Sequence, residues 1–198
     1  MCIRDRGYLG QGIGVSETAV AWIVMAVCAT VIAVLIRCSL GWMMHVVLLI
    51  PSVIAMVALP MASNAGQGPN HDYNTSLGIG FSLAVGLSLG FRVAWASAPR
   101  IESDAAGPVV HRRSALILVI SDAVAVVYAL GLIAFLLPAR YAFDTAFGIA
   151  AIILLVLLAA TLGSSVQSYR AARRGDVDDE AGRRIVTAGA VLMVGAVA

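Results

Sequence analysis

The chain has 198 residues, of which 61% are hydrophobic and only 12% are charged, and its formal net charge is +2. A soluble domain usually carries about 25% charged residues, and a globule of this size exposes much of its surface, so this composition excludes an ordinary water-soluble domain. All 13 basic residues are arginine, which excludes lysine-based chemistry such as a Walker lysine or a Schiff base.

Apolar stretches long enough to cross a bilayer recur along the chain. They cover residues 17–37, 40–62, 76–98, 114–138 and 146–168, and a partial stretch begins at 185. Barrel strands would be shorter and would alternate polar with apolar residues. The sequence therefore predicts an all-α fold, a polytopic transmembrane helix bundle of five complete spans plus a truncated sixth.

The two ends of the sequence suggest a fragment of a longer protein. The opening letters MCIRDR resemble translated sequencing-adapter read-through, so part of residues 1–15 is suspected to be an artefact. We assign residues 1–15 to an extracytoplasmic N-terminal segment and give them no further role. The apolar run that follows Arg184 contains roughly 14 residues, whereas a span needs about 20. We expect a single transmembrane helical domain over 16–198, incomplete at its C-terminus.

Arginine is distributed asymmetrically among the connectors between the predicted spans. The first, third and fifth connectors hold nine arginines, namely Arg37, Arg100, Arg112, Arg113, Arg170, Arg173, Arg174, Arg183 and Arg184. Because positively charged loops stay in the cytoplasm, we expect a bacterial inner-membrane protein with its N-terminus outside. Connectors 99–113 and 169–184 would then be cytoplasmic.

Two opposite charges fall inside predicted spans. Asp122 is eight residues beyond the inner end of the fourth span, about 12 Å along a helix, and Arg92 is about 9 Å deep in the third. Their similar depth predicts an Arg92–Asp122 pair in which each charge offsets the desolvation of the other. Such a pair could fix helix register, or Asp122 could relay a proton or cation. Arg92 could instead extend to the headgroups, which would leave Asp122 protonated or paired with Ser121, Tyr128 or a residue beyond this sequence.

A second candidate cluster is Met43, Met44 and His45, because thioether and imidazole groups suit Cu(I). One histidine gives no metal-binding spacing, so packing methionines beside an interfacial histidine are the alternative. No resident cofactor is predicted.

Small residues repeat every fourth position in the third span, at Gly78, Ser82, Gly86 and Gly90. This spacing favours close helix packing against another helix of this chain or a second copy in a homo-oligomer. Pro51 lies inside the second span and predicts a kink there. The aromatic residues sit near predicted interfaces as a bilayer anchor, so we expect lipid and no nucleic acid as a partner. No Walker, Rossmann, zincin or nucleophile-elbow pattern occurs, and we do not expect an enzyme.

The stretch MMHVVLLIPSVIAM opens an outward helix with methionine and histidine. In this respect the chain resembles a family of small uncharacterised actinobacterial membrane proteins, built from successive hairpins whose outward helices begin with His and Met. The fourth helix departs from that pattern because His111 precedes the span, and the sixth offers no histidine at Ile185. The resemblance implies a membrane protein of unknown role.

Three functional classes remain open. The first is a structural or regulatory membrane subunit, including the membrane part of a sensor. The second is a fragment of a transporter or permease that uses Asp122 and Arg92. The third is a copper-handling membrane protein that uses the cluster at residues 43–45.

Overall fold

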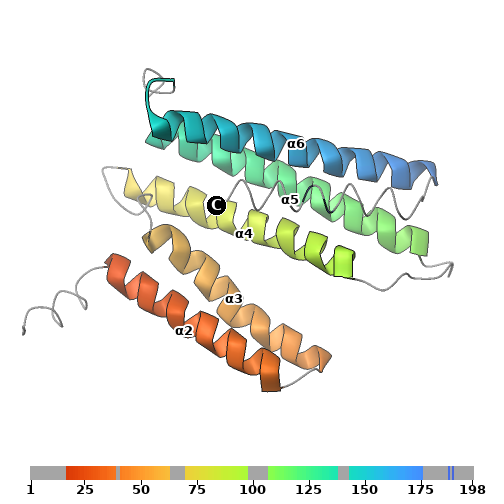
Figure 1. Ribbon diagram of the computed structural model, residues 1–198, viewed down its shortest axis with the longest axis horizontal. Coiled ribbons are helices and arrows are strands. Elements are labelled where there is room, and N and C mark those ends of the chain that lie inside the picture. Colours follow the sequence, from red (N-terminus) through yellow and green to blue (C-terminus); the bar gives the residue numbers. More distant parts are fainter. Residues whose placement is uncertain are drawn as a thin grey trace, which may run out of the picture. The chain divides into compact units, whose positions relative to one another are not determined.

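The computed structural model describes residues 17–38, 41–62, 70–97, 107–137 and 143–175, together with Thr187 and Gly189. Five helices form most of this part of the chain: α2 (Glu17–Cys38), α3 (Trp42–Ala62), α4 (His71–Ser97), α5 (Gly107–Leu136) and α6 (Ala146–Arg174) (Figure 1). Thr187 and Gly189 are also helical, and no strand occurs among the described residues. The all-α prediction is confirmed.

The predicted number of spans is not supported. Among the residues that the structure describes, four helices are long and apolar enough to cross a membrane, over Ala19–Arg37, His71–Trp95, Val109–Leu136 and Ala146–Arg174. Over the described side chains of α3, the apolar stretch is Val46–Met61, which is shorter than these four. Of the predicted sixth span, only Thr187 and Gly189 are described, so five complete spans plus a sixth are not supported.

The chain divides into two compact units. The first contains α2, α3 and α4 up to Leu83, with α2 and α3 side by side. Near the end of α3, Pro60 closely approaches Gly78 of α4, where a Cβ on the glycine would lie 2.8 Å from the proline Cβ. The prediction of one domain over 16–198 concerns the whole chain and stays a prediction.

The second unit contains α4 from Ala84 onward, α5 and α6. The helices α5 and α6 pack side by side and run in opposite directions (Figure 1). Helix α6 is capped at both ends: the Thr145 side chain accepts a 3.0 Å bond from the Gly148 amide, and Gly175 adopts the left-handed conformation at φ 74°. Helix α5 ends at Leu136, two residues before Pro138, since the residue preceding a proline disfavours helical geometry.

Both helices extend beyond the apolar spans predicted from the sequence. Helix α5 begins at Gly107, so Arg112 and Arg113 are helical, and α6 continues through Arg173 and Arg174. These arginine side chains are exposed. The antiparallel packing therefore gathers exposed arginines at one end of the α5–α6 pair.

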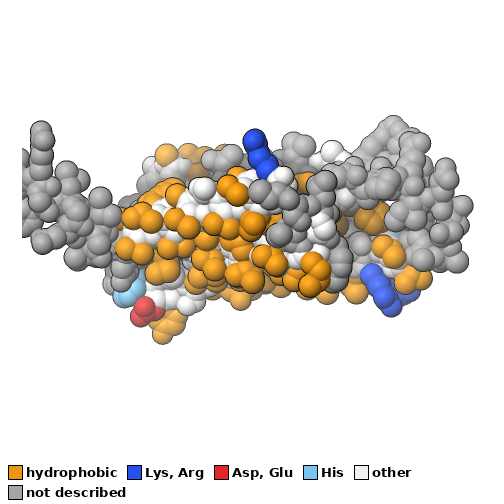
Figure 2. Space-filling model, turned by 90° about the horizontal axis from the view of Figure 1, so that it is seen from below, with side chains coloured by type: hydrophobic (Ala, Val, Ile, Leu, Met, Phe, Trp, Pro, Cys, Tyr) orange, Lys and Arg blue, Asp and Glu red, His pale blue; other side chains and the backbone are white. Residues whose placement is uncertain are grey.

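Small and polar side chains make up most of the buried residues of the second unit, while many large apolar ones face outward. Buried residues include Ala84, Ala115, Ala125, Ala129, Ala151, Ser88, Ser121, Thr161 and Ser165. Exposed ones include Val127, Val156, Phe147 and Ile153. Hydrophobic side chains likewise cover most of the described surface seen in Figure 2, and the few charged ones lie near its margins. This distribution is unfavourable in water and is typical of helices packed within lipid.

Candidate functional site: a buried arginine–aspartate network

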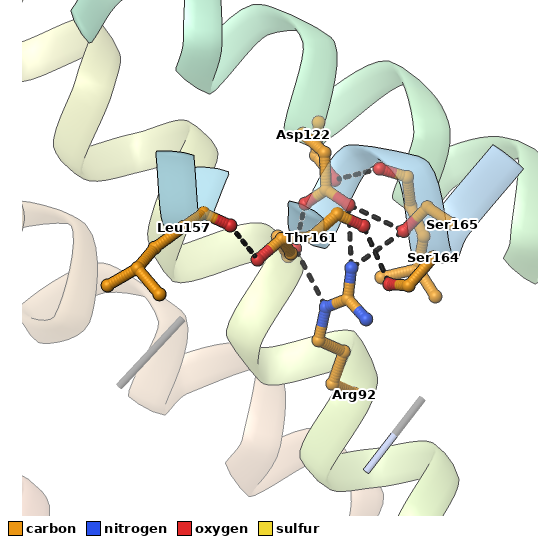
Figure 3. Close-up of polar contacts among 9 residues, drawn as sticks. Arg92, Asp122, Leu157, Thr161, Ser164 and Ser165 are labelled. Atoms are coloured by element: carbon orange, nitrogen blue, oxygen red, sulfur yellow. Dashed lines mark hydrogen bonds and ion pairs between the residues drawn. The ribbon is translucent and has the colours of Figure 1, made fainter. Parts of the chain in front are cut away.

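Three helices of the second unit bring polar side chains to one point. Arg92 and Ser88 lie one turn apart on α4, Asp122 lies near the middle of α5, and Ser165 lies on α6. Figure 3 shows Arg92, Asp122 and Ser165 pointing toward one another. All four are buried, with at most 1% of each residue exposed. A buried charge is tolerated when it is paired and hydrogen-bonded, and this site meets both conditions.

The centre of the site is a direct ion pair. Arg92 Nη2 donates to Asp122 Oδ2 at 2.6 Å, a distance typical of a charge-assisted hydrogen bond. Among the residues the structure describes, the other ion pair is His71 with Asp72 at 3.0 Å, whose side chains are exposed. The sequence predicts similar depths for Arg92 and Asp122, and the structure brings the two side chains together.

Two serine hydroxyls bridge the arginine and the aspartate on either side of the direct bond. Ser165 Oγ accepts from Arg92 Nη2 at 2.6 Å and donates to Asp122 Oδ2 at 2.5 Å. Ser88 Oγ accepts from Arg92 Nε at 3.3 Å and donates to Asp122 Oδ1 at 2.5 Å. Each hydroxyl thus satisfies both charges at once, and both carboxylate oxygens of Asp122 are engaged.

The remaining guanidinium nitrogen, Nη1, faces Gly189. A Cβ placed on this glycine would contact Nη1 and would lie 2.8 Å from Cζ and 3.1 Å from Ser164 Oγ. Only a residue without a side chain fits at this position while the guanidinium stays where it is. Gly189 therefore lies against the part of the guanidinium that is not bonded to Asp122, Ser88 or Ser165.

The arrangement can hold helices together, and it contains groups able to move a proton. As a clamp, the network links all three helices of the second unit through charge-assisted bonds in a low-dielectric interior. As a relay, the carboxylate and the two hydroxyls that donate to it would exchange protons. Because both carboxylate oxygens of Asp122 already accept hydrogen bonds, the arrangement favours the clamp.

The other partners considered for Asp122 are placed elsewhere. Ser121 Oγ donates to the Leu118 carbonyl at 3.1 Å within its own helix. Tyr128 lies on α5 and is partly exposed, with no bond to Asp122 among those the structure describes.

The proposed copper residues lie in the first turns of α3. Met43 is exposed, whereas the side chains of Met44 and His45 lie outside the described residues. Over the described ranges, no group of three or more His, Cys, Asp or Glu could hold a metal ion. The copper site stays a prediction.

The small-residue stripe of α4 is not uniform in its surroundings. Gly78 is buried against Pro60, whereas Gly90 is exposed, and a Cβ added to Gly90 would meet no other described heavy atom within 4 Å. Ser82 and Gly86 are partly exposed. Helix α3 continues through Pro51, so the predicted kink does not end the helix. A role of the stripe in packing stays a prediction beyond the Gly78 contact.

Sequence reasoning missed Ser88, Ser165 and Gly189. A signal existed for Ser165, because α6 carries Thr161, Ser164, Ser165 and Ser168, which share one helical face in an otherwise apolar helix. Ser88 precedes Arg92 by four residues, the spacing that places two side chains on one face. Gly189 had no signal, since glycine is common throughout the chain.

Similar proteins occur in mycobacteria. The chain is 44% identical over 99 residues to the uncharacterised protein Mb0105 of Mycobacterium bovis and to MT0111 of Mycobacterium tuberculosis. It is 35% identical over 147 residues, or 74% of its length, to ML1998 of Mycobacterium leprae. No family model and no solved structure matches. The matches span 15% of the first two relatives and 21% of the third, so this chain is similar to part of longer, uncharacterised mycobacterial proteins.

Proposed function

We propose that this chain is a structural or regulatory part of a bacterial membrane protein, in which α4, α5 and α6 form a bundle fixed by the buried charge network. The observation that carries the proposal is the engagement of both oxygens of Asp122. Three donors on two neighbouring helices, Ser88, Arg92 and Ser165, occupy the carboxylate. A group held in this way fixes helix register.

The membrane setting of this proposal follows from the surface. In the described part of the chain, four helices are long and apolar enough to span a bilayer, and many of their exposed side chains are large and apolar. The exposed arginines at one end of the α5–α6 pair support placing that end, with connectors 99–113 and 169–184, in the cytoplasm. The bilayer, other membrane helices or a second copy of the chain are the partners that suit such apolar faces.

A transporter or permease is the second candidate. It is favoured by a carboxylate inside an apolar helix with two hydroxyls in bonding contact, because ionisable groups within membranes commonly mark ion pathways.

Proton uptake separates the two candidates. The purified protein is reconstituted in liposomes that contain a pH-sensitive dye, and a pH gradient is applied across the membrane. We expect uptake equal to that of empty liposomes, and the same result for Asp122→Asn, since the carboxylate serves as a clamp. Uptake above the empty-liposome rate that Asp122→Asn abolishes would establish the transporter and overturn the structural proposal. Size-exclusion chromatography of both proteins checks that each is folded.

A further inference from the structure

Helix α6 has one exposed face that continues along most of its length. The residues of this face recur at alternating steps of four and three, a spacing that keeps them in line on an α-helix. All of them are exposed, namely Ile149, Ile153, Val156, Ala160, Gly163, Gln167, Arg170 and Arg174. We call this set the outer stripe of α6. It passes from large apolar residues, through small ones, to polar and basic ones at the end of the helix.

The basic end of the outer stripe concentrates positive charge. Arg170 and Arg174 lie one turn apart on the same face, and Arg173 lies beside them. All three are exposed, and none forms an ion pair with a residue that the structure describes. The helix dipole favours arginines in the last turn, which accounts for Arg173 and Arg174 but not for Arg170 one turn earlier. The acidic residues that begin at Asp176 lie outside the described residues.

The middle of the outer stripe has little side-chain bulk. Gly163 has no side chain, Ala160 has a single methyl group, and a Cβ added to Gly163 would meet no other described heavy atom within 4 Å. Beyond them lies Val156, which is 62% exposed. Val156 precedes Gln167 by eleven residues, about 16 Å along the axis, and one leaflet of a bilayer core is about 15 Å thick. The stripe therefore has the length of one acyl chain and leaves room for it.

We propose that the outer stripe of α6 binds an anionic phospholipid of the cytoplasmic leaflet. Arg170 and Arg174 hold the phosphate, because guanidinium groups form paired, charge-assisted hydrogen bonds with phosphate oxygens. The acyl chain lies over Gly163 and Ala160 against Val156. Clusters of basic residues at the cytoplasmic membrane surface attract anionic lipids, which favours this headgroup over a zwitterionic one. The inference rests on the membrane setting of the proposed function.

Native mass spectrometry of the purified protein in detergent tests the site. Phosphatidylglycerol and phosphatidylcholine with the same acyl chains are added in turn, and the dissociation constant of each is measured. Arg170→Gln/Arg174→Gln removes the charges of the stripe. The matched control is Arg112→Gln/Arg113→Gln, which removes two exposed arginines from α5 at the same end of the helix pair. Gly163→Leu covers the path of the acyl chain, and circular dichroism checks that every variant keeps its helices.

We expect the wild-type protein to bind phosphatidylglycerol about tenfold more tightly than phosphatidylcholine. Arg170→Gln/Arg174→Gln should lose this preference, and the control should keep it. Gly163→Leu should weaken phosphatidylglycerol binding about fourfold, the effect of losing contact with one buried methylene. Glycerol phosphate, which has the charge without the acyl chain, should not compete.

Three results would overturn the lipid site. They are equal affinity of the wild-type protein for both lipids, an equal loss in the two double variants, and displacement of the lipid by glycerol phosphate. A protein that stays dissolved without detergent or lipid would overturn the proposed membrane setting and the lipid site together. A protein that needs detergent but shows no lipid preference would overturn the lipid site alone, so the two failures are distinguishable.

Discussion

Gly189 lies directly against the guanidinium of Arg92, where a Cβ on the glycine would lie 2.8 Å from Cζ. The guanidinium cannot move away freely, because Nε and Nη2 are bonded to Ser88, Asp122 and Ser165. The contact joins the chain beyond α6 to the charge network and makes the size of residue 189 a test of that network.

Gly189→Ala should destabilise the protein. The added methyl group would force the guanidinium to shift and lengthen its bonds, at a cost of about 1–3 kcal/mol, the usual range for overpacking. Thermal unfolding in detergent, followed by circular dichroism, measures the effect.

The matched control is Gly163→Ala on α6. Gly163 is exposed, and a Cβ added to it would meet no other described heavy atom within 4 Å. There the substitution should stabilise the helix by up to about 1 kcal/mol through higher helix propensity. Equal melting temperatures for Gly189→Ala and wild type would contradict the close contact.

Removing one charge should cost far more than removing both. Asp122→Leu alone, or Arg92→Met alone, leaves a buried charge without its partner and should cost about 3–5 kcal/mol. The double variant removes both charges and should recover most of that loss. A double-mutant cycle on the unfolding free energies gives the coupling directly. A double variant as unstable as the sum of the two single variants would show that the residues act independently.

The two bridging serines should differ in their contribution. Ser165 Oγ makes bonds of 2.6 and 2.5 Å with Arg92 and Asp122, whereas Ser88 Oγ makes bonds of 3.3 and 2.5 Å with the same pair. We expect Ser165→Ala to cost about 2 kcal/mol and Ser88→Ala somewhat less, within the range for bonds to charged groups.

Ser164→Ala is the control for the serine variants. Its hydroxyl donates at 2.7 Å to the Thr161 carbonyl within the same helix, outside the charge network. The lost bond is offset by the higher helix propensity of alanine, so its melting temperature should stay near that of wild type. A Ser165→Ala melting temperature equal to that of Ser164→Ala would argue against the bridge.

Some features of this fold follow from the sequence because they depend on position along a helix. Counting residues from the span ends placed Arg92 and Asp122 at one depth, since an α-helix has a fixed rise. The helical class followed from apolar stretches too long for strands. These inferences need no knowledge of which helices are neighbours.

Other features depend on packing across helices, which a single sequence does not fix. Ser88 and Ser165 form hydrogen bonds with Asp122 only because α4 and α6 both pack against α5 at the depth of that residue. The sequence predicted α5 and α6 to be shorter than they are. The length of an apolar stretch indicates the part of a helix that lies in the bilayer, whereas the helix itself continues for as long as its backbone hydrogen bonds do.

Gly78→Ala tests packing in the first unit. A Cβ on Gly78 would lie 2.8 Å from Cβ and 3.2 Å from Cγ of Pro60, and the rigid proline ring cannot rotate out of the way. The end of α3 would have to move away from α4, at a cost of about 1–3 kcal/mol. Gly90→Ala, on the same helix and with no other described heavy atom within 4 Å of the added Cβ, should instead be neutral or stabilising. Thermal unfolding of the two variants gives the comparison, and a Gly90→Ala loss as large as that of Gly78→Ala would mean that helix packing at the stripe extends to both glycines.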